Sequence, residues 1–247
     1  MPLIASPETL SIDNAKLPFA EQIAFFRGKK GLKIPTEHFD DIETDEHQRA
    51  FVVAQAQKAD MLTDFYNAVD EAITEGQSID WFRSQFDDIV KKNGWVYNGS
   101  ASFRTRTIYE TNMLTSYARG RDAQLADPDL RAARPYLEYN LGAAEHHRPV
   151  HVSYAGITLP YDDPWIAVHR PVCAWGCHCW LRAVANPTPG KDKAPRESSY
   201  EYTDRWGEIH AIPVGVDYGF HHDFKPDKRD YPTPIGKALD QAIKDGP

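Results

Sequence analysis

The character of the sequence changes near Tyr136, and this change constrains the fold more than any other feature. Before it, long segments carry apolar residues at helical spacing, whereas after it short β-favouring runs alternate with glycine and proline. We therefore expect an α+β protein: a helical N-terminal region followed by a mixed domain with a long helix, a small antiparallel sheet and a Cys/His-rich loop. A chain of 247 residues can bury a sizeable core for such a fold.

Helices are predicted throughout the first half of the chain. The segment His47–Glu75 contains no glycine or proline, and its apolar residues share one face: Leu62, Phe65, Val69 and Ile73. Similar patterns predict three further helices, which run from Pro18 to Gly31, from Ser78 to Gly94 and from Phe103 to Leu125. We interpret the aromatic side chains of these segments as packing residues.

Strands are predicted after the change in character. The β-favouring runs are Tyr136–Leu141, Val150–Tyr154, Ile157–Leu159 and Tyr200–Val214, with hairpin turns at Ala155-Gly156 and Asp204–Gly207. These elements divide the chain into a helical N-terminal region (1–98), a core with the long helix and the Cys/His loop (99–190), and a C-terminal β-rich extension and tail (191–247).

Charge is distributed unevenly along the chain. Residues 37–88 hold fourteen acidic side chains against three basic ones, a local net charge of −11, so the remainder of a chain with total charge −8 carries +3. Such a region repels phosphate, which makes the first half a poor nucleic-acid surface, and a solvated helical face is the simpler interpretation. With no long apolar run and no secretion signal in MPLIASPETL, we expect cytoplasmic synthesis and no membrane partner.

All three cysteines fall within one short segment, in the spacing Cys173-x3-Cys177-x-Cys179. This crowding is unlike a secreted disulfide framework and fits thiols or metal ligands in a reducing compartment. With His169 as the fourth ligand, or with His151 in its place, the cysteines satisfy the ligand requirement of a tetrahedral zinc ion.

Two alternatives to a zinc site stay open. In the first, the cysteines only pack and the two histidines are structural, hydrogen-bonded beside Asp162 or Asp163. In the second, the segment belongs to a metal-dependent hydrolase or nuclease that activates water with His146, His147, His151, Asp162, Asp163 and His169. The sequence contains no His-Glu-x-x-His motif and no nucleophile elbow, so we expect no enzymatic activity.

Several motifs follow one another in a fixed order. The long predicted helix carries Glu110-Thr111-Asn112 and Tyr117-Ala118-Arg119-Gly120-Arg121, and the later segment carries Arg148-x-x-His151, Gly156, Asp162-Asp163-Pro164-Trp165, Pro171 and Trp175-Gly176-Cys177-His178-Cys179. In this order they resemble the phage Mu F-like minor head proteins, also called phage head morphogenesis proteins, over residues 18–185. The family commonly has Cys-Arg-Cys where this chain has Cys177-His178-Cys179, and its usual pattern has no counterpart of Cys173.

The resemblance implies a minor capsid protein of a tailed phage or prophage. Such a protein is made in the bacterial host cytoplasm and incorporated inside the head near the portal, where it assists head assembly or DNA delivery. The implied partners are portal, major capsid or scaffold proteins, with packaged DNA as a further contact. The family core corresponds to 99–190, and its motif marks as structural Glu110, Arg121, Arg148, His151, Asp163, Trp165, Trp175 and Gly176.

Head-morphogenesis modules of this type can also be fused to toxin domains, which gives a toxin-related alternative. About sixty residues follow the module in this sequence, which is small for an added catalytic domain. We therefore favour the assembly function.

Basic residues concentrate outside the acidic region and suggest where acidic partners would bind. The ends of the long predicted helix carry Arg104, Arg106, Arg119 and Arg121, and the loop 191–196 is also basic. We expect these side chains to contact capsid protein, portal or DNA.

The Asp162–Trp165 turn is a candidate packing site. Asp followed by Asp-Pro favours a tight turn, and an indole buries a large apolar area when it finds a neighbour. We expect the turn and Trp175 to form one packed corner.

Overall fold

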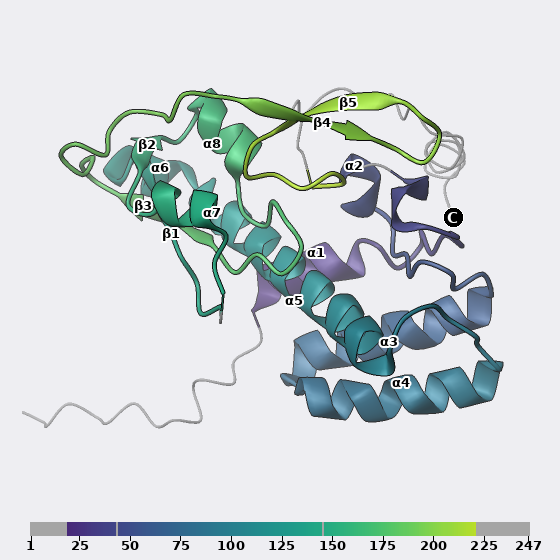
Figure 1. The fold of residues 1–247 in the computed structure, drawn as a ribbon. Coiled ribbons are helices and arrows are strands. Elements are labelled where there is room, and N and C mark those ends of the chain that lie inside the picture. The colour runs from purple at the N-terminus through teal and green to yellow at the C-terminus, as the bar shows by residue number, and fades with distance from the viewer. Residues whose placement is uncertain (1–18, 43, 145, 221–247) are drawn as a thin grey trace, which may run out of the picture.

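The computed structural model describes residues 19–42, 44–144 and 146–220 (Figure 1). Two groups of elements are joined by one long helix, α5 (Ala101–Leu125), which runs diagonally between them (Figure 1). One group is helical and the other combines short helices with small antiparallel sheets, so the fold is α+β as predicted. Among the described residues, no helix is both long and apolar enough to cross a membrane.

The helical group comes first in the chain. It consists of α1 (Ala20–Arg27), the 3-10 helix η2 (Phe39–Asp41), α2 (Thr44–His47), α3 (Ala59–Glu75) and α4 (Ile79–Asn93). The predicted ends of α3 and α4 are confirmed. Gly76 and Gly94 adopt the left-handed conformation that ends a helix, and the Ser78 hydroxyl accepts a hydrogen bond from the Trp81 backbone N–H at the start of α4.

The core of this group is aromatic. Phe65, Phe82 and Phe86 are fully buried between α3, α4 and the first turns of α5, and burying such a ring stabilises the fold by about 1.5–3 kcal/mol. Phe65 and Phe86 both contact the ring of Trp95, with centroids 5.4 and 6.0 Å apart. These rings are therefore packing residues, as the sequence predicted.

The prediction of one helix over His47–Glu75 is wrong in its first part. Residues between α2 and α3 run without helix, and the Phe51 backbone N–H donates to the Leu32 carbonyl at 2.8 Å. Ile34 N–H in turn donates to the Phe51 carbonyl at 3.1 Å. Phe51 is buried in the aromatic core, so tertiary contacts outweigh the local helical preference.

The second group is built on a three-stranded antiparallel sheet in the order β2-β1-β3. Its elements are α6 (Pro128–Ala133), β1 (Tyr136–Asn140), α7 (Pro149–Tyr154), β2 (Thr158–Pro160), α8 (Pro164–His169) and β3 (Trp180–Val184). A separate hairpin of β4 (Ser199–Thr203) and β5 (Ile209–Pro213) follows, with its turn at the predicted place. In Figure 1 this hairpin extends back towards the region of α2.

The prediction of a strand over Val150–Tyr154 is wrong, because this segment forms helix α7. Pro149 occupies the first turn, where its missing N–H costs nothing, and the six-residue helix is too short to show a 3.6-residue period in the sequence. Ala155-Gly156 consequently joins a helix to β2 and is not the turn of a β-hairpin.

Helix α5 belongs to both cores. Ile108 packs with the aromatic core, whereas Leu125 packs with the core around the sheet. At Gly120 the helix α1 crosses α5 so closely that a Cβ atom would lie 2.6 Å from the Gln22 backbone nitrogen. The division into 1–98, 99–190 and 191–247 stays a prediction, and 1–18 and 221–247 lie outside the described residues.

Candidate functional site

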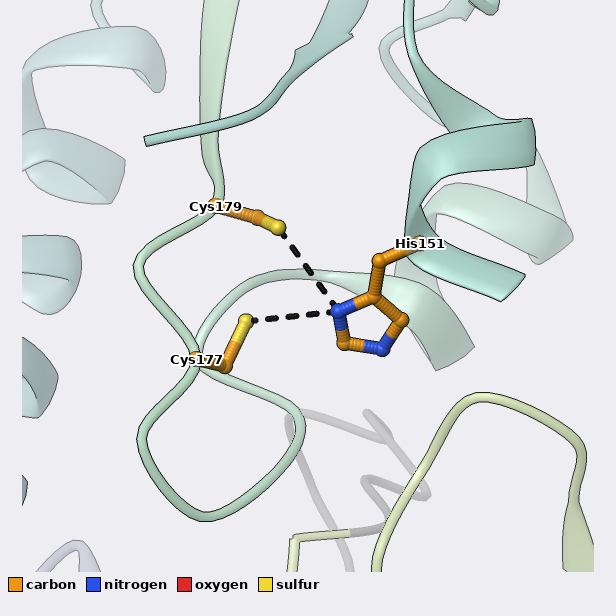
Figure 2. Close-up of side chains that lie close together, drawn as sticks. All are labelled: His151, Cys177 and Cys179. Carbon is orange, nitrogen blue, oxygen red and sulfur yellow. Dashed lines mark hydrogen bonds between the residues drawn. The ribbon is translucent and has the colours of Figure 1, made fainter. Parts of the chain in front are cut away.

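Three buried side chains from two parts of the chain converge beside the sheet. His151 projects from α7, and Cys177 and Cys179 lie on the loop that leads into β3 (Figure 2). The His151 Nδ1 atom lies 3.8 Å from Cys177 Sγ and 3.6 Å from Cys179 Sγ. The three potential ligand atoms all lie within 4.8 Å of one another, so this group could hold a metal ion.

Cys173 is the nearest further thiol. It is fully buried, with its Sγ 4.0 Å from His151 Nε2, whereas the other two sulfurs lie near Nδ1. Its Sγ also lies 3.6 Å from the Gly215 carbonyl oxygen. The structure therefore gathers all three cysteines of the sequence around one histidine.

The electrostatics of the cluster favour one thiolate. Hydrogen bonds from the Cys173 and Cys179 thiols hold the pKa of Cys177 far below its ordinary value. Their own pKa values are raised, first by the hydrogen bond to Cys177 and then by burial. Burial alone would lower the pKa of His151, but its contact with Cys177 and its hydrogen bond to Gly215 raise that pKa above the usual value.

His169 lies outside this group. Its Nδ1 faces the Trp165 carbonyl at 3.1 Å and its Nε2 faces the Val214 carbonyl at 3.2 Å. Its ring stacks on the Trp165 indole with centroids 4.4 Å apart, and burial lowers its pKa. The histidine beside the cysteines is therefore His151, the alternative ligand of the sequence analysis.

A closing segment (214–217) completes the site from far along the chain. The Gly215 carbonyl accepts a hydrogen bond of 2.7 Å from His151 Nε2, and the Asp217 backbone N–H donates to the Cys173 carbonyl at 2.9 Å. The Asp217 carboxylate accepts hydrogen bonds from the Arg148 side chain and the Trp175 backbone N–H. This segment has no recognisable signal in the sequence, because it contributes mainly backbone carbonyls and one ordinary aspartate.

We expect Gly215→Ala to destabilise the protein by about 1–3 kcal/mol, because Gly215 has a φ of +93° and an alanine Cβ would lie 2.8 Å from the Tyr154 hydroxyl. Gly207→Ala is the matched control: its φ is +87°, and nothing lies within 4 Å of the added Cβ. Thermal unfolding of both variants separates packing from backbone strain. Equal losses of stability would contradict the close packing of Gly215 against Tyr154.

The expectation that Trp165 and Trp175 form one corner is wrong. Trp165 is buried and contacts Tyr154 with ring centroids 4.9 Å apart. Trp175 remains 36% exposed and packs against Phe39 and Phe220 instead. The two indoles therefore make different contacts. Trp165 packs inside the core, whereas Trp175 joins the Cys loop (residues 170–179, between α8 and β3) to more distant parts of the chain.

The arginines of α5 divide into internal and surface residues. The Arg119 side chain is 7% exposed and pairs with Asp122, and Arg104 donates to the Ala54 carbonyl and lies over the Trp95 ring. Because both side chains already bind groups within the protein, we no longer expect Arg119 and Arg104 to contact a partner protein or DNA. The prediction stays for Arg106, with a 66% exposed side chain, and for half-buried Arg121.

The other motif residues hold local geometry. Glu110 pairs with Arg106 at 3.2 Å, and Arg121 donates to Gln124, which in turn donates to Glu21 of α1. The Asp163 side chain caps α8 through the Trp165 N–H at 2.9 Å. Gly176 has a φ of +63°, which suits glycine in the Cys loop.

The structure does not assemble the residues of the hydrolase alternative into one centre. Asp162 pairs with Arg131 and Asp163 caps α8. Within the described ranges the second group of potential ligands is Asp204, Glu208 and His210, at the β4–β5 turn. There the Asp204 carboxylate accepts hydrogen bonds from His210 and from two backbone N–H groups, which is the pattern of a turn that satisfies its own polar groups.

Comparison with known proteins shows similarity to one family. Residues 63–182 match the model of the family described as Phage Mu protein F like protein. This segment spans most of α3, all of α4 and α5, and the Cys/His site, so the similarity to that family runs through the elements described above. No solved structure matches the chain significantly.

Two curated relatives show the same similarity. The chain is 32% identical over 187 residues to the "Putative capsid assembly protein F" of Escherichia phage Mu, which covers 69% of this chain and 41% of the relative. It is 30% identical over 166 residues to the "Mu-like prophage FluMu F protein" of Haemophilus influenzae, covering 62% of this chain and 39% of the relative. The match thus spans about two fifths of each relative.

Proposed function

We propose that this protein is a minor capsid component of a tailed phage or prophage, incorporated inside the head near the portal, where it assists head assembly or DNA delivery. The observations that carry this proposal are the similarity to the phage Mu protein with a capsid-assembly name and the family match over residues 63–182, which includes helix α5 and the Cys/His site. The partners would be portal, major capsid or scaffold proteins. A structural role without catalysis fits motif residues that cap, pack and pair within the fold.

Quantitative mass spectrometry of purified phage particles and empty proheads tests this proposal directly. We expect the chain in both, at a fixed ratio to the portal protein, because a head component is built in before DNA enters. A host protein of similar abundance serves as the control for contamination. Absence of the chain from both particle types would reject the proposal, whereas presence in proheads and loss after DNA ejection would favour DNA delivery.

Charge reversal on α5 tests the partner contact. Arg106→Glu and Arg121→Glu, made separately, should reduce incorporation into proheads if these side chains meet an acidic partner. Lys91→Glu is the control, since Lys91 is an exposed cation on α4 that directly follows the acidic region 37–88. Each variant must first keep the wild-type melting temperature. Full incorporation of both arginine variants would exclude these ends of α5 as the interface.

A further inference from the structure

The geometry of the Cys/His cluster is that of a metal-thiolate site. A tetrahedral zinc ion lies about 2.3 Å from sulfur and about 2.0 Å from nitrogen, which places such ligand atoms about 3.6 Å apart. The two distances from His151 Nδ1 to the Cys177 and Cys179 sulfurs are 3.8 and 3.6 Å (Figure 2). These two separations thus match the nitrogen–sulfur edges of a zinc tetrahedron.

The second ring nitrogen of His151 supports the same interpretation. Nε2 donates to the Gly215 carbonyl at 2.7 Å, and because a carbonyl oxygen only accepts, this contact places the proton on Nε2. In the neutral ring the Nδ1 lone pair then faces both sulfurs. A histidine that ligates a metal characteristically donates its other N–H to a backbone carbonyl in this way.

Tyr139 provides an independent observation at the site. It is fully buried in β1, its hydroxyl lies beside the Cys179 sulfur, and the hydroxyl makes no hydrogen bond of ordinary geometry within the described chain. Buried polar atoms without a partner are rare in proteins and call for an explanation. A metal-bound thiolate is a far better acceptor for this hydroxyl than a neutral thiol.

We propose that His151 Nδ1 and the sulfurs of Cys177 and Cys179, with Cys173 Sγ as the fourth ligand, bind one zinc ion. Cys173 is the nearest remaining sulfur, at 4.0 Å from His151 Nε2, and rotation about its single side-chain bond redirects the thiol. Four protein ligands leave no open position for water, so this zinc is structural. The ion would link α7 to the Cys loop and so reinforce a part of the fold whose sheet has only three strands.

The metal content of the full chain decides the question. Protein without an affinity tag, purified from cells with no added metal, should contain close to one zinc per chain. Chelation should lower the melting temperature, and zinc but not magnesium should restore it. Cobalt should replace zinc and give a thiolate-to-cobalt charge-transfer band. Protein that arrives without zinc and takes up neither zinc nor cobalt would overturn the proposal.

Variants assign the ligands. Cys177→Ser and Cys179→Ser should each lose the metal, and Cys173→Ser should reduce the thiolate-to-cobalt band by about one third, because one of three equivalent sulfurs is lost. His178→Ala is the matched control, since His178 stands between two ligands in the sequence but lies outside the ligand group. Full zinc in either Cys177→Ser or Cys179→Ser overturns the proposed site, and an unchanged band in Cys173→Ser overturns its fourth ligand.

The wild-type cobalt spectrum keeps this test independent of folding in the variants. Three thiolates and one imidazole predict a stronger charge-transfer band than a site with fewer sulfurs. The zinc content and the cobalt spectrum do not depend on a role in head assembly, because metal content and particle membership are measured separately.

Discussion

Replacing Trp165 with alanine should lower the free energy of unfolding by about 3–5 kcal/mol, the range for removing a large aromatic side chain from a core. The indole is only 2% exposed and lies among the rings of Tyr139, Tyr154 and His169. Two of these neighbours also hold the closing segment through the Val214 carbonyl. The cavity would therefore loosen the wall of the Cys/His site as well as the core.

Chemical denaturation followed by circular dichroism measures this loss. Trp206→Ala is the control, because Trp206 is 58% exposed at the β4–β5 turn, and surface substitutions of this kind change stability by about 0.5 kcal/mol or less. A soluble Trp165→Ala variant with the wild-type denaturation midpoint would show that this indole contributes little to the core.

The second large effect is expected at Asp122. Its carboxylate receives Arg119 at 2.8 Å and Arg170 at 2.7 Å, and both guanidinium side chains are less than a tenth exposed. Asp122→Ala removes the carboxylate that these two buried cations share, so we expect a loss of about 3 kcal/mol. The ion pair between Asp122 and Arg170 joins α5 to the residue that follows α8. The substitution should therefore also weaken the attachment of α8 to α5.

The chain offers a matched pair for this experiment. Asp80 and Arg83 on α4 have the same three-residue separation, at 2.6 Å, but their side chains are 81% and 43% exposed. Asp80→Ala should cost about 0–1 kcal/mol, and added salt should reduce that cost further. The loss in Asp122→Ala should depend little on salt. Similar losses in the two variants would contradict a special role for the buried pair.

Helix ends were the part of the fold that sequence predicted best. Ser78 before α4 and glycine after α3 and α4 act through local hydrogen bonds and a left-handed backbone, so their effect is visible within a few residues. The prediction failed where distant contacts decide. Phe51 leaves the helix because its backbone pairs with Leu32 and Ile34, which no local pattern reveals.

At the candidate site, too, the sequence predicted local features but not contacts between distant residues. The sequence drew attention to the three cysteines because they are neighbours along the chain. It could not choose between His151 and His169, since spacing does not tell which ring faces the sulfurs. The choice is made by α7, which directs His151 to the cysteines, and by Trp165, against which His169 stacks. The short helix α7 itself was mistaken for a strand, because its residues favour β structure.

The α5 arginines were predicted from charge alone, which does not distinguish an exposed cation from a buried one. Arg119 lies at the point where α5 meets the loop after α8, and its neighbour Gly120 lies where α1 crosses. The motif Tyr117–Arg121 therefore describes the packing of α5 against two other elements. Such a role depends on tertiary structure and has no signal in composition.

The closing segment has a consequence for the order in which the protein can be completed during synthesis. His151 obtains the carbonyl of a residue that is translated 64 positions later. At about 5–20 residues per second, the ribosome needs several seconds to add those residues. Gly215 follows Cys179 by 36 positions, so for about 2–7 seconds after the last cysteine is added the closing segment does not yet exist. During that time the three thiols stay open to oxidants and to cellular metal ions.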